Sequence, residues 1–268
     1  MKTYTLITGA SQGFGKAMAL DCAQRKMNLL LIALPNSGLG ALAQFIKTNL
    51  DVDVQYLEMD LSTTESCFSI LEYIHKHEIS IQYLINNAGV LSRGLFDTLD
   101  TTFILKQIAV NVTTPTLLIR LLLDNLKQSE RAGILNISSM ASFFTLPKKQ
   151  VYGATKSYIT AFSKTLNKEL RQHNISVTTI CPGGLNTTTR LCYQNRLVSW
   201  VTRQTVLNPE EAANIAINAM LQHKTLLVPG FVNQCLMFLN KILPEFIKDR
   251  LTNRELDKFP PGKLQTSV

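Results

Sequence analysis

The chain has 268 residues, 46% of them hydrophobic, and a formal net charge of +8; it can form one large core, and no repeat or Pro/Gly/Ser-rich linker divides it. The basic residues are scattered, which argues against a nucleic-acid partner and favours a solvated surface with one phosphate-binding pocket. The uncharged apolar stretches are far shorter than the roughly 18 residues that span a membrane, and the five cysteines have no metal-ligand spacing, so we expect a cytoplasmic protein without a transmembrane helix or a metal.

Short β-rich runs alternate with longer helical runs along the chain. The first lies within residues 1–10, MKTYTLITGA, so nothing resembling a signal peptide precedes the fold. Several runs, LLLIA and VTTIC among them, are apolar throughout, as expected for strands that helices cover on both faces. The pattern predicts one doubly wound parallel sheet of about seven strands, at residues 4–8, 28–33, 52–57, 82–86, 133–138, 176–181 and 225–228.

A glycine-rich turn, TGASQGFG, follows the first strand and precedes an amphipathic helix. Glycine lets the backbone turn tightly and approach a pyrophosphate, whose charge then meets the free N–H groups at the start of the helix near Gly13. The alternative is a glycine turn that serves only tight strand-to-helix packing. Its position between a strand and a helix is the context that a dinucleotide-binding turn requires.

Other chemically distinctive stretches follow later strands. Asp60 comes after the third, Asn86–Gly89 closes the fourth, Ser138–Ser139 closes the fifth and Pro182–Gly184 closes the sixth. Ligands of open α/β sheets bind at the carboxyl ends of the strands. We therefore expect these stretches to form one site.

Tyr152 and Lys156 lie four residues apart on a predicted helix and so share one face of it. An ammonium beside a phenol stabilises the phenolate and lowers the tyrosine pKa from about 10. The pair predicts a general acid with its tuning cation. Asn111 precedes Pro115 by four residues, and because proline has no N–H, the Asn111 carbonyl loses its helical partner. That carbonyl is then free to bind water, unless the helix is merely kinked.

The motifs TGxxxGxG, NNAG, Asn111, Ser139, YxxxK and PGG, in this order and spacing, resemble the short-chain dehydrogenase/reductase family over about residues 1–230. The resemblance implies a single-domain Rossmann-type fold, NAD(H) or NADP(H) as cofactor, and interconversion of a ketone and a secondary alcohol by hydride transfer. The catalytic residues that it implies are Asn111, Ser139, Tyr152 and Lys156, with Ser138 as the alternative serine.

The resemblance also implies the cofactor contacts. The second strand ends in Ala33–Ser37, without the acidic residue that would bind the ribose 2′-OH of NAD or an arginine for a 2′-phosphate. We favour NADP, with NAD possible. Asp60 is either an adenine contact or a helix cap. The cofactor-binding residues are Gly9, Ser11, Gln12, Gly13, Phe14, Gly15, Leu34, Asn36, Asp60, Leu61, Asn87, Ala88, Gly89, Tyr152, Lys156, Pro182, Gly183 and Thr187.

We predict one catalytic domain over residues 1–258, with a substrate lid at 188–206, a C-terminal helical segment at 230–257 and a disordered tail at 259–268. An apolar stripe from Phe231 to Leu243 either packs against the body or a second subunit, lines a substrate mouth, or contacts a membrane surface.

The proline-glycine turn and the apolar C-terminal segment are similar to the hydroxysteroid dehydrogenase and 3-ketoacyl reductase branch of the family. They favour an apolar ketone or alcohol as substrate, steroid-like or with an acyl chain, and a homo-oligomer as the assembly. The alternatives are a catalytically silent NAD(P)-binding sensor or scaffold, and a sugar epimerase or dehydratase, for which the chain is short.

Overall fold

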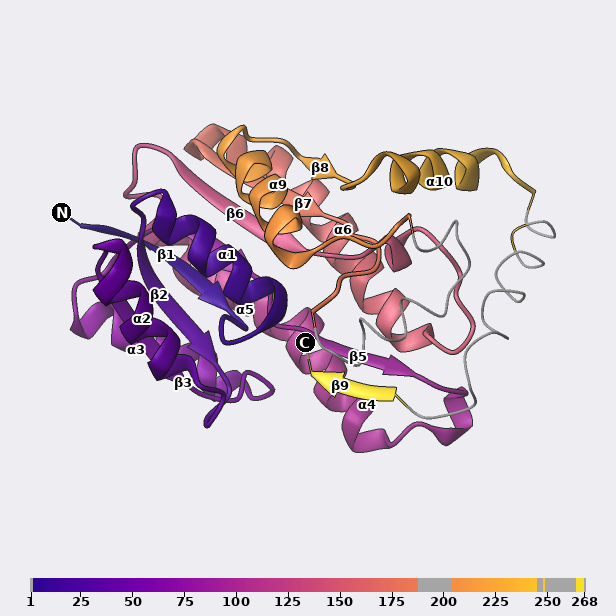
Figure 1. Cartoon of the computed structure of the whole chain (residues 1–268), viewed down its shortest axis with the longest axis horizontal. Coiled ribbons are helices and arrows are strands. Elements are labelled where there is room, and N and C mark those ends of the chain that lie inside the picture. The colour runs from indigo at the N-terminus through magenta and orange to yellow at the C-terminus, as the bar shows by residue number, and fades with distance from the viewer. Residues whose placement is uncertain (1, 188–203, 245–247, 249–263, 268) are drawn as a thin grey trace.

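The computed structural model describes residues 2–187, 204–244, 248 and 264–267. Its main sheet has seven parallel strands in the order β3-β2-β1-β4-β6-β7-β8 (Figure 1). The chain therefore reverses its direction of winding between β1 and β4, the kind of switch point where ligands bind. The predicted doubly wound parallel sheet is confirmed, with strands β1 (Thr3–Thr8), β2 (Asn28–Ala33), β3 (Val54–Glu58), β4 (Ser80–Asn86), β6 (Ala132–Ile137), β7 (Ile175–Ile180) and β8 (Leu226–Leu227).

Helices cover both faces of this sheet. Alternate residues of β2 point to opposite sides: Leu29 and Leu31 pack with α1, α2 and α9, whereas Leu30 and Ile32 pack with α3, α5 and α6. Continuous apolar strands are what two covered faces require. The helices are α1 (Gly13–Gln24), α2 (Leu39–Leu50), α3 (Thr64–Lys76), α4 (Thr101–Ile108), α5 (Thr114–Leu126), α6 (Gln150–Leu170), α9 (Pro209–Leu221) and α10 (Phe231–Ile242).

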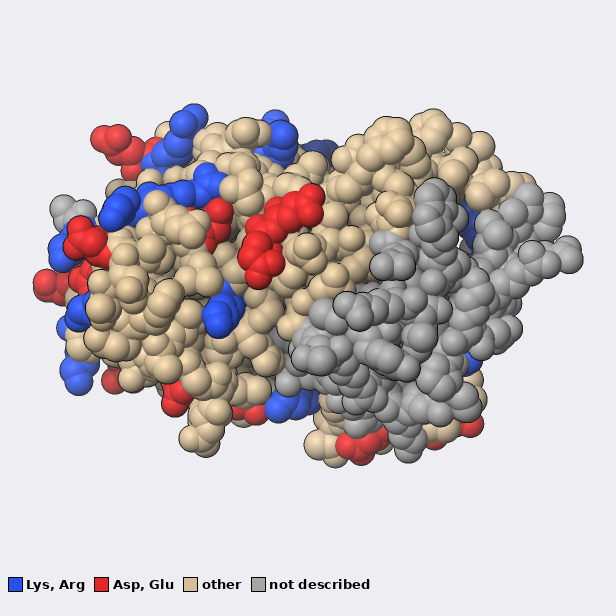
Figure 2. Space-filling model, in the orientation of Figure 1, with Lys and Arg blue, Asp and Glu red and all other residues tan. Residues whose placement is uncertain are grey.

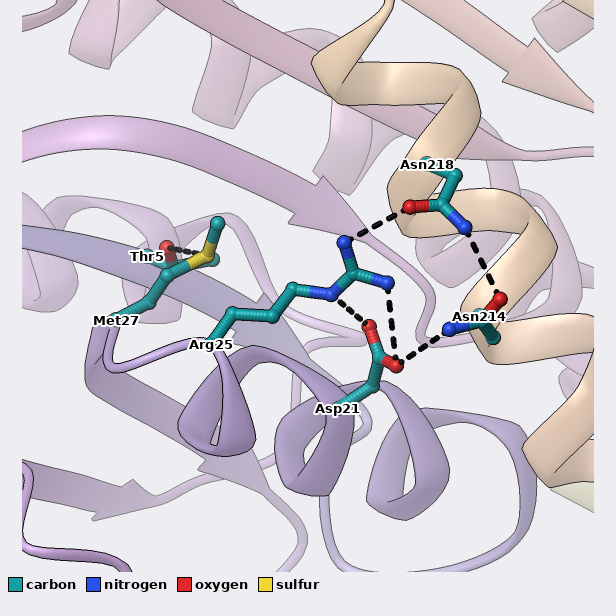
Figure 3. A network of polar contacts seen from close by, with 6 residues as sticks. All are labelled: Thr5, Asp21, Arg25, Met27, Asn214 and Asn218. Atoms are coloured by element: carbon teal, nitrogen blue, oxygen red, sulfur yellow. Dashed lines mark hydrogen bonds and ion pairs between the residues drawn. The ribbon is translucent and has the colours of Figure 1, made fainter.

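A polar network joins α1 to α9 (Figure 3). Arg25 Nε donates to Asp21 Oδ2 at 2.7 Å, and its Nη1 donates to Asn218 Oδ1 at 2.8 Å. Asn214 Nδ2 of α9 donates to the same carboxylate at 3.2 Å. Because α1 begins at the glycine turn, this network fixes the helix whose start forms that turn.

One long helix runs through Thr101–Leu126 and joins α4 and α5. Its 26 residues are long and apolar enough to cross a membrane by length and composition. The expectation that the chain has no such segment considered only uncharged apolar stretches. This helix is longer than those stretches because it includes a few charged residues. In this structure Leu118, Ile119 and Leu122 of the helix pack in the core under the sheet.

Residues 264–267, which lie within the expected disordered tail of 259–268, form a strand, and the rest of that expected tail lies outside the described residues. β9 (Leu264–Ser267) pairs antiparallel with β5 (Val90–Arg93), with Val90 opposite Ser267 (Figure 1). β5 lies outside the seven-stranded sheet and therefore offers an open edge of N–H and C=O groups. The polar composition of the tail concealed this partner, because backbone pairing needs no apolar side chain.

The expected C-terminal helix begins at Phe231 but ends at Ile242, shortly before Pro244; most of the remaining expected helical residues lie outside the described part of the chain. Its apolar stripe faces outward: Phe231, Phe238 and Ile242 are 79%, 62% and 63% exposed. Its inner side includes polar Asn233 and Asn240, which bond to backbone carbonyls of the body. Of the predicted roles of the stripe, packing against the described part of the body therefore does not hold, and contact with a second subunit, a substrate mouth or a membrane surface stays a prediction.

On the face shown in Figure 2, charges of both signs are intermixed over α1 and α2, whereas the surface over α10 is largely uncharged. On this face, the described basic residues are therefore scattered and do not gather in one patch.

Replacement of Arg25 by methionine tests the α1–α9 network. We expect Arg25→Met to lower the free energy of unfolding by about 1–2 kcal/mol, because a charge-assisted pair and a bond to Asn218 are lost. The control is Lys127→Met, which removes an exposed pair with Asp124 at 3.7 Å and should change stability by less than about 0.5 kcal/mol. Equal values for both variants in urea unfolding would contradict the assigned role.

Candidate active site

The glycine turn forms a backbone cradle at the end of β1. Gly9 and Gly13 have φ angles of 66° and 52°, the left-handed region that glycine adopts without strain. A Cβ on Gly15 would overlap the Gly9 carbonyl oxygen. Gln12 at the N-cap of α1 makes no side-chain capping bond, and the first turn has no acidic residue. The free N–H groups and the helix dipole therefore fit a phosphate group.

The fourth strand's NNAG turn is bonded directly to this cradle. The Thr8 hydroxyl accepts from the backbone N–H groups of Asn87 and Ala88 at 3.0 and 3.1 Å. Asn87 Nδ2 donates to the carbonyls of Thr8 and Gly9, each at 3.0 Å. Thr187 also lies close, because a Cβ on Gly13 would stand 2.9 Å from its Cβ. The structure thus brings these predicted cofactor residues together.

The end of β2 provides a second place that suits an anion. Asn36 has φ 58° and Gly38, the N-cap of α2, has φ 78°. The Ser37 hydroxyl is buried without a hydrogen-bond partner. The first turn of α2 contains no acidic residue. Ala33 is buried, but the Leu34 side chain is 37% exposed and borders this region.

Asp60 has two partners at the end of β3. Its carboxylate accepts from Ser62 N at 2.9 Å and from Lys106 Nζ at 2.9 Å. Burial acts to raise its pKa, but the bonds from Lys106 and Ser62 outweigh burial and the pKa is lowered. The Ser62 bond is a local turn contact, and the N-cap of α3 is Thr63 rather than Asp60; the carboxylate still has lone pairs for a further donor.

Lys156 is buried with one hydrogen bond. Its Nζ donates to the carbonyl of Ile137, at the end of β6, at 2.9 Å. Burial lowers the pKa of Lys156 to about 8. A Cβ on Gly89 would lie 3.5 Å from this Nζ, so the NNAG turn and the lysine share one wall of the site. The ammonium is therefore held at the carboxyl edge of the sheet.

Tyr152 lies one turn earlier on α6 and is partly buried. Burial raises the pKa of Tyr152, and a hydrogen bond with Ser139 lowers it in part. The expected lowering by Lys156 is not found, because Lys156 Nζ lies 5.8 Å from the centre of the ring and is engaged by Ile137. The phenol is consequently protonated at neutral pH.

The two adjacent serines have different surroundings. Ser138 is buried and donates to the Lys156 carbonyl at 2.9 Å, with Thr160 Oγ1 at 2.7 Å. Ser139 is less buried; its hydroxyl accepts from Ala141 N at 3.1 Å and contacts Tyr152. Ser138 therefore anchors α6, and only Ser139 meets the tyrosine.

Asn111 lies in a π-helical turn, Ala109–Thr113, between α4 and α5. Pro115, the second residue of α5, cannot donate to the Asn111 carbonyl, which gives a local reason for the altered helix. The Asn111 side chain accepts from Val90 N at 2.8 Å and donates to Val90 O at 2.9 Å. It also donates to Thr155 Oγ1 at 3.0 Å. This asparagine thus bridges β5 and α6.

Thr8 and Thr155 are site residues that the sequence analysis missed. Thr155 Oγ1 receives the Asn111 bond and donates to the Tyr152 carbonyl at 2.8 Å. Each belongs to a motif that was recognised, TG and YGATK, but a threonine inside a motif has no spacing signal of its own. Their roles emerge only when the strand ends are brought together.

Most of the expected lid, residues 188–203, lies outside the described residues. The chain on either side of it is joined, because Leu185 and Leu207 form a parallel bridge. Asn233 of α10 donates to the carbonyls of Thr205 and Pro229 at 3.2 and 2.7 Å. A Cβ on Gly183 would lie 2.5 Å from the Thr205 carbonyl oxygen. The PGG turn and the base of the lid are therefore packed closely together.

A phosphate cradle at the switch point of a parallel sheet, with a partly buried phenol and a buried ammonium beside it, defines an oxidoreductase of the Rossmann type. The model of the family described as short chain dehydrogenase matches residues 3–195. The chain belongs to that family, on its hydroxysteroid dehydrogenase and 3-oxoacyl reductase side, and is an NAD(P)-dependent oxidoreductase.

Named relatives agree with this placement. Putative steroid dehydrogenase 4 of Caenorhabditis elegans is 31% identical over 268 residues, which cover 94% of this chain and 96% of the relative. Human 17-beta-hydroxysteroid dehydrogenase type 3 is 30% identical over 191 residues, 70% of this chain and 60% of the relative. A short-chain dehydrogenase from Sphingobium yanoikuyae, solved in complex with NADPH, has a TM-score of 0.76 and 26% identity, covering 91% of this chain and 97% of the other.

Proposed function

We propose that this protein is an NADP-preferring enzyme that interconverts a bulky apolar ketone and its secondary alcohol, with Tyr152 as the proton donor in reduction. The observation that carries the proposal is the convergence of Ser139, Lys156 and Asn111 around this tyrosine at the carboxyl edge of the sheet. A silent sensor or scaffold is not favoured, because it would not need this arrangement. NADPH, when bound, supplies the hydride.

Each catalytic side chain has a distinct task in this proposal. Tyr152, whose pKa is raised by burial, keeps its proton until the carbonyl oxygen gains negative charge, and then donates it. The Ser139 hydroxyl holds that oxygen. Lys156 contributes its positive charge and a donor for the cofactor ribose. The Asn111 carbonyl, to which Pro115 at the i+4 position cannot donate, binds a water that returns a proton towards Lys156.

The glycine turn, Asn87, Asp60 and Thr187 would hold the cofactor. NADP preference is supported at the end of β2, where residues 33–37 contain no carboxylate. The unpartnered Ser37 hydroxyl and the uncapped start of α2 suit a 2′-phosphate, because a helix N-terminus and free donors attract anions. The solved Sphingobium relative binds NADPH, in agreement with this choice.

The preference for an apolar substrate rests on the side chains beside Ser139. Met140, Phe143 and Phe144 form an apolar cluster with Leu236 and Met237 of α10. The names of the steroid dehydrogenase relatives point the same way, as does a solved alcohol dehydrogenase from Comamonas testosteroni that is specific for bulky-bulky ketones, 25% identical with a TM-score of 0.74.

A homo-oligomer also belongs to the proposal. Leu105 and Ile108 of α4 and Tyr158 of α6 are 64%, 40% and 40% exposed, and α4 contacts α6, so these side chains provide an apolar surface for a second subunit.

The cytoplasm stays the predicted location, and the long apolar helix Thr101–Leu126 is the feature that favours a membrane instead.

Replacement of Tyr152 by phenylalanine tests the central proposal. Tyr152→Phe should lower kcat for NADPH-dependent ketone reduction by about 10²–10⁴-fold, because only the proton donor is lost. The Kd for NADPH, followed by its fluorescence, should change less than about twofold. Tyr158→Phe on the same helix, whose hydroxyl lies 3.2 Å from Thr116 Oγ1, is the control and should retain wild-type kcat. Near-native turnover by Tyr152→Phe would exclude this tyrosine as the acid.

The pH dependence should reflect Lys156. Its pKa of about 8 means that it is charged below pH 8 and loses its proton as the pH rises. The kcat for reduction should therefore be constant below pH 7 and fall about tenfold per pH unit well above pH 8. Lys156→Arg keeps the charge, so its residual activity should lack this decrease. An identical decrease of kcat in both proteins would show that the titration of another group causes it.

An aspartate at the end of β2 tests the cofactor proposal. We place it at Leu34, which is partly exposed, because an aspartate at buried Ala33 would put a charge among apolar side chains. Leu34→Asp should shift the ratio of kcat/KM for NADPH over NADH towards NADH by at least about tenfold, through repulsion of the 2′-phosphate and a bond to the ribose 2′-OH. Leu34→Asn, of equal size and without the charge, should shift it far less. A wild type that strongly prefers NADH would overturn the assignment.

A further inference from the structure

β5 forms a wall of the site that the main sheet does not support. It belongs to a separate two-stranded sheet with β9, yet it follows the NNAG turn without a break and carries Val90, to which Asn111 is bonded. β5 pairs with β9 (Figure 1), and the N–H and C=O groups of Val90 bond to side chains of α4 and the π-helical turn. The position of Val90 therefore depends on those side chains.

Gln107 of α4 supplies one of these side chains, one helical turn before Asn111. Its side chain is fully buried, with an exposed fraction of 0%. Its Nε2 donates to the Val90 carbonyl at 2.8 Å, and its Oε1 accepts from Ser92 Oγ at 2.7 Å. Ser92 is itself 1% exposed. The amide thus uses both of its ends on β5, away from bulk water, where an unpaired polar group is costly.

The Val90 carbonyl is shared by two amides. Gln107 and Asn111 both donate to it, and Asn111 also accepts from Val90 N. From Asn111 the chain of bonds continues to Thr155 and to the Tyr152 carbonyl. If β5 moves, the Asn111 carboxamide must either follow it or lose its partners. The orientation of Asn111 is therefore coupled to the bond that Gln107 makes.

We propose that Gln107 is a positioning residue: with Ser92 it fixes β5 and thereby sets Asn111 relative to Tyr152 and Lys156. This inference rests on the proposed function only for its kinetic consequence. Small displacements of catalytic groups are expensive in rate, so a residue without contact to cofactor or substrate can control turnover here. The glycine turn is held by its own bonds from Asn87 to Thr8 and Gly9, so the affinity for NADPH should change little.

The test compares Gln107→Met with Asn125→Leu, each of which replaces an amide by an apolar side chain of similar size. Asn125 makes the same kind of clamp on the start of β4, accepting from Ile81 N at 2.7 Å and donating to Ile79 O at 2.9 Å, remote from the catalytic group. We expect Gln107→Met to lower kcat about ten- to hundredfold with the KM for NADPH changed less than twofold. Asn125→Leu should leave both constants near wild type.

Hydrogen exchange provides a readout that does not need turnover. The exchange of the backbone amides of residues 89–92 is measured by mass spectrometry of NADPH-bound protein. These amides should exchange faster than in the wild type in Gln107→Met, and at the wild-type rate in Asn125→Leu. If Gln107→Met fails to fold, Ser92→Ala, which removes only the bond to Oε1, should show the same pattern with a kcat loss of about two- to tenfold.

The outcomes separate this inference from the proposed function. Faster exchange at residues 89–92 with a selective loss of kcat supports the positioning role. Exchange and kcat equal to those of Asn125→Leu would overturn it, even if the wild type reduces ketones as proposed. A wild type that binds NADPH but reduces no ketone of a broad panel would overturn the proposed function, whereas the exchange result would still decide whether Gln107 holds β5.

Discussion

Backbone groups that leave a parallel sheet must find new hydrogen-bond partners, and this requirement shapes the whole site. Where a strand ends, its N–H and C=O groups lose the neighbouring strand while still buried. In this protein carboxamide side chains supply many of the missing partners. Asn87 binds the glycine turn, Asn111 and Gln107 bind β5, and Asn233 binds the carbonyls of Thr205 and Pro229. A carboxamide can donate and accept at once, so it matches a backbone segment in a way that a charged side chain cannot.

The same requirement accounts for the buried lysine. Lys156 Nζ uses the carbonyl of Ile137, a group that the last residue of β6 presents at the carboxyl edge. One carbonyl compensates only part of the cost of removing an ammonium from water, and the lowered pKa of the lysine expresses the remainder. An ammonium with an incomplete set of acceptors is prepared for further acceptors from a bound ligand. The shortage of hydrogen-bond acceptors around Lys156 thus agrees with a role in binding a ligand rather than with a structural role.

The sequence predicted the fold well because the chemically distinctive residues directly follow the predicted strands. Apolar runs gave seven strands within about two residues of their observed limits, and the distinctive residues followed five of them. It also predicted that Asn111 would differ from an ordinary helical residue, from Pro115 alone. It failed where a property depends on three dimensions: the Tyr152 pKa is raised because burial outweighs a lysine that points to Ile137. Neither the lysine's direction nor the depth of the phenol can be read from a spacing of four.

Two features near the C-terminus, the outward-facing stripe of α10 and the pairing of β9, could not be predicted from the sequence. Periodicity identified the apolar stripe of α10 correctly, but it cannot tell which face of a helix a protein turns inward. Here the inward face includes Asn233 and Asn240, which donate to the carbonyls of Thr205, Pro229 and Phe143, together with Leu236 and Met237, which pack in the cluster of Met140. Likewise β9 pairs with β5 through backbone groups, which composition does not describe. In both places backbone groups make contacts that apolar patterning, on which the sequence analysis depended, does not reveal.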